Sequence, residues 1–139
     1  MSSSGYSGTP LAKKLGIKEG FKIKIVAAPE YYFNLFETFP DGVEILDDCN
    51  NSSKDLIHFF SKEANDLYKQ LPLLQKEIVS NGSIWISWPK KASKIDTDIT
   101  EDVIRSLALS IGLVDVKVCA VDAVWSGLKL VIPIKLRQK

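Results

Sequence analysis

The sequence predicts a single α/β domain built on a six-stranded, mostly parallel sheet with helices on both faces. Three observations favour this class. Predicted strands and helices alternate along most of the chain, which is typical of parallel sheets. The last two predicted strands follow one another across a short loop, which indicates an antiparallel hairpin. The chain has 139 residues, 45% of them hydrophobic, enough for one core in a three-layer domain.

The first half of the chain alternates apolar strands with helical segments. Residues 1–8 carry no apolar pattern and are predicted to be a flexible lead-in, which leaves one domain over 9–139. Strands are identified here by alternating or continuous apolar residues between proline, glycine or acidic turns. The expected elements are a short helix capped by Thr9 and ended by Gly16, a strand over 21–27, a helix over 30–39, and strands over 43–46 and 55–60.

The second half continues this alternation and ends in the hairpin. Ser61 is expected to cap a long helix that Pro72 kinks or divides, because proline removes a helical hydrogen bond. Asp98 or Thr100 is expected to cap the last helix, and Gly112 to end it. The remaining expected elements are strands over 83–88, 114–120 and 128–134, with a hairpin loop over 122–127.

This order of elements resembles the class I methyltransferase fold. On that analogy the strands are arranged in the order 2-1-3-4-6-5, with the sixth strand antiparallel to its neighbours. One helix and one strand of the full fold are then missing between the second and third strands. The analogy predicts the architecture and leaves the activity to the residues of the site.

Four segments carry a resemblance to a known family. They read SGYSGTPLAKKLGI, ISWPKKAS, TDITEDVIR and GLVDVKVCAVDAVWSGLKLV. Together they resemble, over nearly the whole chain, a family of small bacterial proteins catalogued as domain of unknown function three thousand and fifty-two. The resemblance implies a stand-alone, soluble bacterial protein. It implies no catalytic residues, because that family has no established reaction.

Charge and cysteine content argue against several classes of protein. Lys and Arg total 18 against 17 Asp and Glu, and this net charge of +1 argues against nucleic acid or an anionic membrane as partner. Cys49 and Cys119 lack metal-ligand spacing, which predicts a reduced, cytoplasmic protein without a metal site. No apolar run approaches the roughly 18 residues of a membrane span, and the N-terminus lacks the features of a signal peptide.

A ligand in such a sheet binds beyond the carboxyl ends of the strands, where the strand order reverses. A methyltransferase would carry a glycine-rich turn after the first strand and an acid after the second. Asp47 or Asp48 supplies the acid, although a strand-ending turn is the favoured explanation of both. The turn AAPEYY has no glycine, and its Pro29 lacks a backbone donor. We therefore expect no cofactor, with S-adenosylmethionine as the disfavoured alternative.

The expected ligand-binding residues follow the ends of the first four strands. The loop after the fourth strand combines lysines with a tryptophan and can hold a phosphate or carboxylate; a solvated loop is the alternative. Lys13, Lys14 and Lys18 extend this patch if the N-terminal helix packs nearby. The candidates are Glu30, Tyr31, Asp47, Ser61, Trp88, Lys90, Lys91 and Ser93.

Aromatic residues and the histidine suggest further roles. His58 is the one histidine and lies within an apolar strand, so a buried side chain with one hydrogen-bond partner is favoured over proton transfer. Tyr32 matches the apolar stripe of its helix, which leaves Tyr31 free to stack on a ligand. Trp125, in the hairpin loop, either plugs the edge of the sheet or forms an exposed contact for a partner.

The sequence favours a non-catalytic binding or regulatory module that holds a small anion or a protein segment in the strand-end cleft. Two alternatives stay open. One is a minimal methyltransferase or other transferase, in which Asp47 holds the cofactor ribose and Glu30 acts as acid or base. The other is a structural protein that acts as an oligomer.

Overall fold

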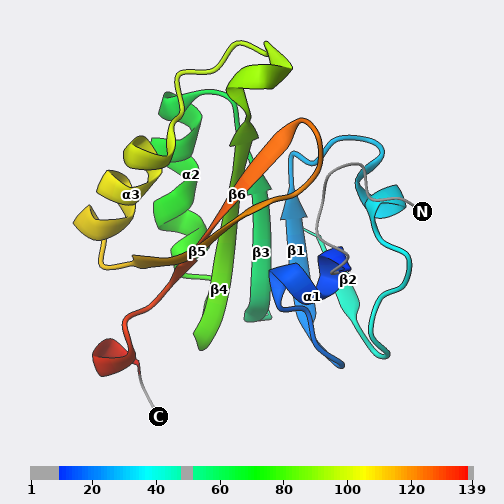
Figure 1. The fold of residues 1–139 in the computed structure, drawn as a ribbon. Helices are drawn as coiled ribbons and strands as arrows, with labels where there is room; N and C mark the ends of the chain where they lie inside the picture. The colour runs from blue at the N-terminus through cyan, green and yellow to red at the C-terminus, as the bar shows by residue number, and fades with distance from the viewer. Residues whose placement is uncertain (1–9, 48–51, 138–139) are drawn as a thin grey trace.

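The computed structural model describes residues 10–47 and 52–137 (Figure 1). In this part of the chain, six strands form one sheet. The strands are β1 (Lys22–Val26), β2 (Glu44–Leu46), β3 (Lys54–Phe60), β4 (Ile78–Pro89), β5 (Val114–Ala120) and β6 (Trp125–Val131). The α-helices are α1 (Leu11–Leu15), α2 (Ala64–Gln75) and α3 (Glu101–Ser110), and the 3-10 helices are η1 (Tyr32–Leu35), η2 (Lys91–Ser93) and η3 (Ile134–Leu136).

The sheet has the predicted topology. Its strand order is β2-β1-β3-β4-β6-β5, and β2, β1, β3 and β4 are parallel neighbours. β6 is antiparallel to both β4 and β5, so the hairpin is confirmed. Only residues 47–53 join β2 to β3, too short a connection for the helix and strand that the full fold would carry there. The length of this connection agrees with the expected loss of these two elements.

Two apolar cores lie on opposite faces of the sheet. Figure 1 shows α2 and α3 together on one face, where they pack on a core that includes Phe59 and Trp88. On the other face, α1 and η1 pack on a second core that includes Phe60, Trp85 and Trp125. Successive strand residues point to opposite faces, so neighbours such as Phe59 and Phe60 belong to different cores. The three-layer arrangement follows from this alternation.

The predicted helix over 30–39 is wrong. The structure has only the short 3-10 helix η1, and the backbone of Phe36 is already extended. Aromatic side chains favour a helix weakly, and here they pack on one another instead. The ring of Tyr32 meets those of Phe33 and Phe36 edge-on, and Phe36 stacks on Phe39 with 4.6 Å between the ring centroids. A compact aromatic loop thus replaces the helix.

α2 runs through Pro72 as one helix, so of the two expected outcomes, a kink or a division into two helices, the division is wrong. Its buried residues are Ala64, Leu67, Leu71 and Leu74, which form one helical stripe against the sheet. Burying this stripe outweighs the single hydrogen bond that proline removes. Among the helices of the described ranges, none has the length and apolar character needed to cross a membrane.

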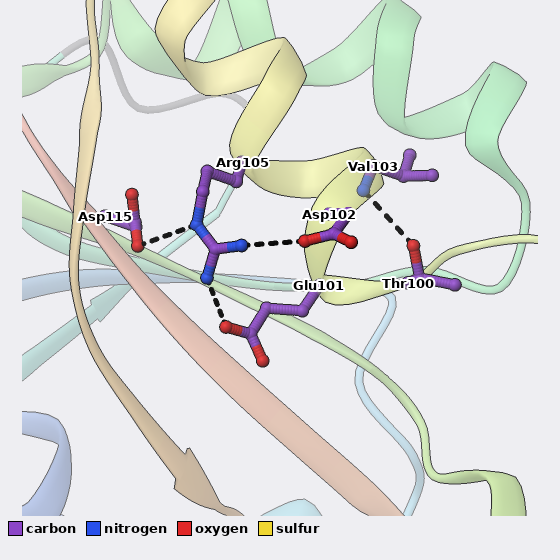
Figure 2. Close-up of polar contacts among 6 residues, drawn as sticks. All are labelled: Thr100, Glu101, Asp102, Val103, Arg105 and Asp115. Carbon is purple, nitrogen blue, oxygen red and sulfur yellow. Dashed lines mark hydrogen bonds and ion pairs between the residues drawn. The ribbon is translucent and has the colours of Figure 1, made fainter.

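The helix caps differ in part from the prediction. Thr100 caps α3, because its side-chain oxygen accepts a hydrogen bond from the backbone N–H of Val103 at 3.2 Å (Figure 2). Ser61 does not cap α2, since its hydroxyl donates to the carbonyl of Glu63. Asp98 accepts the hydrogen bond from the Ala64 N–H instead, at 2.7 Å. A residue far along the chain therefore completes the start of α2.

β4 and β6 both begin earlier than predicted. β4 starts at Ile78, whereas the strand was expected to begin at residue 83. β6 starts at Trp125, because the Asp122 carboxylate accepts the backbone N–H groups of both Val124 and Trp125 at 2.8 Å. This local hydrogen bonding closes the hairpin within a shorter loop than 122–127.

Buried ion pairs connect β1 and β3 to the residue that precedes β4. Lys24 and Lys54 are both buried, and each donates to the carboxylate of Glu77 at 3.0–3.1 Å. Burial by itself raises the pKa of Glu77, but the hydrogen bonds from Lys54 and Lys24 hold it below its usual value. On α3, Arg105 similarly joins Glu101 and Asp102 to Asp115 of β5 (Figure 2).

Adding a methyl group at Gly127 is expected to destabilise the fold. A Cβ there would lie 3.1 Å from the Cε3 atom of Trp85, a ring with no exposed surface. Overpacking of this kind costs about 1–3 kcal/mol. The Gly127→Ala variant should therefore unfold at lower urea concentration than wild type, whereas Ser126→Ala, the neighbouring control, should change the free energy of unfolding by less than about 0.5 kcal/mol. Equal stability of the two variants would contradict this packing.

Candidate functional site

A cleft of about 240 Å³ opens at the carboxyl ends of β1 and β3. From these two neighbouring strands the chain leaves in opposite directions, towards β2 and towards β4, so the cleft lies where the strand order reverses. The sequence predicted a site at this position. The residues that line the cleft are Ala27, Phe60, Ser61, Lys62, Glu63, Asp66 and Trp125.

Ala27, the first residue after β1, has an unusual backbone. Its φ angle is +60°, in the left-handed region that glycine adopts easily and that costs other residues about 1–2 kcal/mol. Its side chain is exposed at the cleft. The turn after β1 thus has the backbone shape of a glycine turn although the sequence AAPEYY contains no glycine.

Aromatic rings form one wall of the cleft. Trp125 is 8% exposed and meets the ring of Phe60 edge-on, with centroids 5.0 Å apart. Its indole N–H donates to the hydroxyl of Tyr31 at 3.2 Å. Trp125 therefore packs within the sheet and is not an exposed contact for a partner. Tyr31 is 38% exposed, so part of its ring is accessible for the stacking role that the sequence suggested.

The polar rim of the cleft comes from the connection between β3 and α2. Ser61 is buried and supports this connection, because its backbone N–H donates to the carbonyl of Ser87 at 3.0 Å. Lys62 and Glu63 are exposed, and Asp66 is half-buried one turn into α2. Glu63 and Asp66 were not among the predicted ligand-binding residues. Their position in the sequence shortly after the third strand, at the switch point, was the signal that could have identified them.

A buried polar chain lies behind the cleft. The two ring nitrogens of His58 are hydrogen-bonded to the hydroxyls of Tyr32, at 3.0 Å, and Ser87, at 2.8 Å. His58 also stacks on Phe60 of the cleft wall, with centroids 4.3 Å apart. Burial lowers the pKa of His58 to about 3 and raises that of Tyr32. His58 is thus buried as expected, with two partners rather than one, and is neutral at physiological pH.

The other candidates from the first two strands do not line the cleft. Asp47 directly follows β2 and is exposed at the carboxyl end of that strand, next to β1. Glu30 is exposed in the turn before η1 and does not line the cleft. Asp48 and Cys49 lie outside the described residues. Within 10–47 and 52–137, no three His, Cys, Asp or Glu side chains come together as a metal site.

The candidates after β4 are not assembled as predicted. Trp88 is 9% exposed and belongs to the core under α2 and α3, so its ring is not part of the lysine loop. Ser93 uses its hydroxyl within the loop, where it donates to the carbonyl of Lys90 at 2.6 Å and accepts from the N–H of Ile95. Lys90 is half-buried and Lys91 is exposed. Only the two lysines therefore keep side chains available for an anion.

Comparisons with known proteins identify structural relatives. No family model matches this chain, and no curated protein matches it by sequence. LepI in complex with S-adenosylmethionine (SAM) is similar over 89% of this chain, with a TM-score of 0.55 and 12% identity; the chain spans 47% of LepI, less than half its length. A SAM-dependent methyltransferase from Aquifex aeolicus has a TM-score of 0.54 and 15% identity, over 86% of each chain. Magnesium protoporphyrin IX methyltransferase (ChlM) from Synechocystis PCC 6803 with bound SAM has a TM-score of 0.57 and 8% identity, over 88% of this chain and 74% of its own.

These similarities show that the chain has a class I methyltransferase-like α/β fold, as predicted. They also correct two expectations. The sequence favoured a non-catalytic module without a cofactor, whereas LepI and ChlM carry SAM and the Aquifex relative is named for its dependence on it. The expectations of a non-catalytic module and of no cofactor are therefore not retained, and the alternative, a SAM-dependent methyltransferase, becomes a proposal for this chain.

The buried state of His58 predicts how stability depends on pH. Between the ordinary histidine pKa of 6.5 and the folded value of about 3, the unfolded chain binds a proton that the folded chain does not. The His58 contribution to the free energy of unfolding should thus be complete above pH 6.5 and fall by up to about 1.4 kcal/mol per unit below it. Urea titrations at pH 7.5 and 4.5 should show a smaller difference between wild type and His58→Gln at the lower pH.

A direct measurement provides the control, because the chain has one histidine. Its ring proton signals in the NMR spectrum should not titrate above about pH 4. A midpoint near 6.5 would show that the side chain is accessible, contrary to the structure.

Proposed function

We propose that this chain is a small SAM-dependent methyltransferase that binds the cofactor at the carboxyl ends of β1 and β2. The observation that carries the proposal is the left-handed turn at Ala27, which opens into the cleft at the switch point of a methyltransferase-like sheet. A non-glycine residue adopts this backbone at a cost in free energy, and such strain is concentrated at functional sites. The turn thus keeps the shape that a bound nucleoside requires.

The residues present fit the nucleoside end of the cofactor. Lys24 of β1 pairs with Leu46 of β2, so Asp47 comes next in register and lies beside the end of β1. A carboxylate at this position can accept hydrogen bonds from both hydroxyls of a ribose. The methyl group of Ala27 occupies part of the space that a glycine would leave open. The fit therefore depends on the backbone shape of the turn and on the position of the Asp47 carboxylate. The methyl group of Ala27 leaves the cofactor less space at the turn than a glycine would.

The size of the cleft indicates how the cofactor would be held. About 240 Å³ is smaller than the roughly 300–1,000 Å³ of typical ligand pockets. The connection between β2 and β3, residues 47–53, is too short to add both a helix and a strand that would enlarge it. We infer that the cofactor lies across the strand ends and stays partly exposed to solvent.

The chain's own residues would provide the surroundings of the reaction. When bound, SAM supplies an electrophilic methyl group. Phe60 and Trp125 form an apolar wall that excludes water from one side of the cleft. Glu63 and Asp66 place carboxylates at the rim, where either can accept a proton from a substrate nucleophile. This assignment replaces Glu30, which does not line the cleft.

Calorimetry with SAM and S-adenosylhomocysteine tests the proposal. Both compounds should bind the wild-type protein. Asp47→Ala should weaken binding about 10- to 100-fold, because a hydrogen bond to a charged group contributes about 1.5–3 kcal/mol. Glu44→Ala, at the opposite end of the same strand, is the matched control and should bind as wild type. Absence of binding at millimolar concentration, or equal affinities of the two variants, would refute the proposed site.

Substitutions at Ala27 test the role of the turn. Ala27→Gly should relieve the left-handed strain and remove the methyl group from the cleft. We expect about 0.5–1 kcal/mol of added stability, after allowing for the flexibility of glycine in the unfolded chain, and tighter SAM binding. Ala27→Val should lower both the stability and the affinity for SAM, since a β-branched residue is strained further at positive φ. If the two variants had the same stability and affinity, the turn would have no part in binding.

A further inference from the structure

Five lysines gather on the α1 face of the sheet, and we call them the lysine strip. Lys117 of β5 lies directly opposite Lys129 of β6, so both side chains share one face. The ammonium of Lys117 donates to the backbone carbonyl of Lys14 at 3.3 Å, and that of Lys129 lies 3.6 Å from the position of a Cβ at Gly16. The members of the strip are Lys14, Lys18, Lys90, Lys117 and Lys129.

The charges of the strip act on one another. Burial lowers the pKa of Lys129 below its usual value, and Lys117 and Lys18 lower it further. Cys119 lies among them: burial raises the pKa of its thiol, whereas Lys14, Lys117 and Lys90 lower it. The charged side chains that affect these two groups are all lysines. The strip therefore concentrates positive charge on one face of a protein whose net charge is only +1.

This concentration has a cost for the folded state. Like charges directly opposite each other on neighbouring strands are destabilising. The hydrogen bond of Lys117 to the C-terminal turn of α1 has a structural explanation, because cations stabilise the carbonyls at helix ends. The ammonium of Lys129 also lies at this helix end, beside the C-cap residue Gly16, and its charge faces Lys117 across the hairpin. An anion bound between the two would remove the repulsion.

The strip continues into the cleft of the proposed active site. The backbone N–H of Lys90 donates to the carbonyl of Val124 at 2.8 Å, and the preceding residue, Pro89, pairs with Trp125. Trp125 lines the cleft and is hydrogen-bonded to Tyr31, whose ring is partly exposed. A positively charged surface thus leads to an aromatic edge. This combination is characteristic of sites for single-stranded nucleic acid, in which cations hold the phosphates and aromatic rings stack on bases.

We propose that the lysine strip binds the phosphodiester backbone of a single-stranded nucleic acid and directs one of its bases past Tyr31 into the cleft. The proposal names the substrate class of the proposed methyltransferase and rests on that function. The total charge of the sequence argued against nucleic acid. Binding depends, however, on where the positive charge lies, and in this protein it is concentrated in the lysine strip. An acidic protein would match the lysines but would make no use of the aromatic edge.

Fluorescence anisotropy with a labelled twelve-nucleotide RNA, and with DNA of the same sequence, tests the proposal. The logarithm of the affinity should fall linearly with the logarithm of salt concentration. In the double variant Lys117→Gln, Lys129→Gln the slope should decrease by about 1.4, since each phosphate contact to a single strand contributes about 0.7. The thermal stability of this variant should be at least that of wild type, because a repulsive pair has been removed.

The matched control is Lys69→Gln, Lys76→Gln. It removes the same charge from exposed positions of α2 and its C-cap, on the other face of the sheet, and should leave affinity and slope unchanged. An equal loss of oligonucleotide affinity in both double variants would mean non-specific electrostatic attraction and would overturn the proposal. Competition by poly-glutamate as effective as that by unlabelled oligonucleotide would indicate an acidic protein partner and would also overturn it. Equal affinity for RNA and DNA would indicate phosphate contacts alone, and a preference for RNA contacts to the 2′-hydroxyl; both support it.

The anisotropy measurement needs no cofactor, so the two proposals fail separately. Oligonucleotide binding through the strip without calorimetric SAM binding would retain the nucleic-acid surface and reject the methyltransferase. SAM binding without oligonucleotide binding would retain the methyltransferase and reject the nucleic-acid surface.

Discussion

The alternation of side chains along β3 and β4 is the constraint on which the rest of the structure depends. Both strands are buried on both faces, so a slip of one residue would exchange the contents of the two cores. Trp85 and Trp88, three residues apart, accordingly belong to opposite cores. The indole N–H of Trp85 donates to the carbonyl of Leu15 at 2.9 Å and so holds α1 on its face. The register of one central strand thus positions the helix that carries part of the lysine strip.

His58 links this core to the cleft. Its hydrogen bonds to Tyr32 and Ser87 join η1, β3 and β4 through one buried imidazole. The loop after β1 has no long helix to anchor it, and this buried hydrogen bond, with the aromatic contacts of Tyr32, fixes its position. Because the pKa of His58 is about 3, the support behind Phe60 stays uncharged in the physiological range.

Hydrophobic periodicity was enough to locate the strands, because each strand's burial is encoded in its own residues, and the analogy to the class I methyltransferase fold then predicted their order. The errors have a common physical cause: they depend on contacts between distant or competing groups. The start of β6 is set by the Asp122 carboxylate, and the cap of α2 by Asp98. The aromatic spacing over 30–39 suits a helix almost as well as the packed loop that forms. At the site, the position of the cleft was predictable from topology, whereas the left-handed backbone of Ala27 was not, since no glycine marks it.

Two departures from local rules adjoin one surface. Every buried side-chain nitrogen and oxygen of the described residues has a hydrogen-bond partner, so the interior of the fold shows no general strain of this kind. Ala27 and Lys94 have a left-handed backbone, and Lys117 lies opposite Lys129. Ala27 lies in the cleft and the lysine pair belongs to the strip that leads to it, whereas Lys94 ends η2 in the loop after β4. Such costs persist where function requires them and the rest of the fold offsets them. The positions of Ala27 and of the lysine pair therefore support this surface as the working face of the molecule.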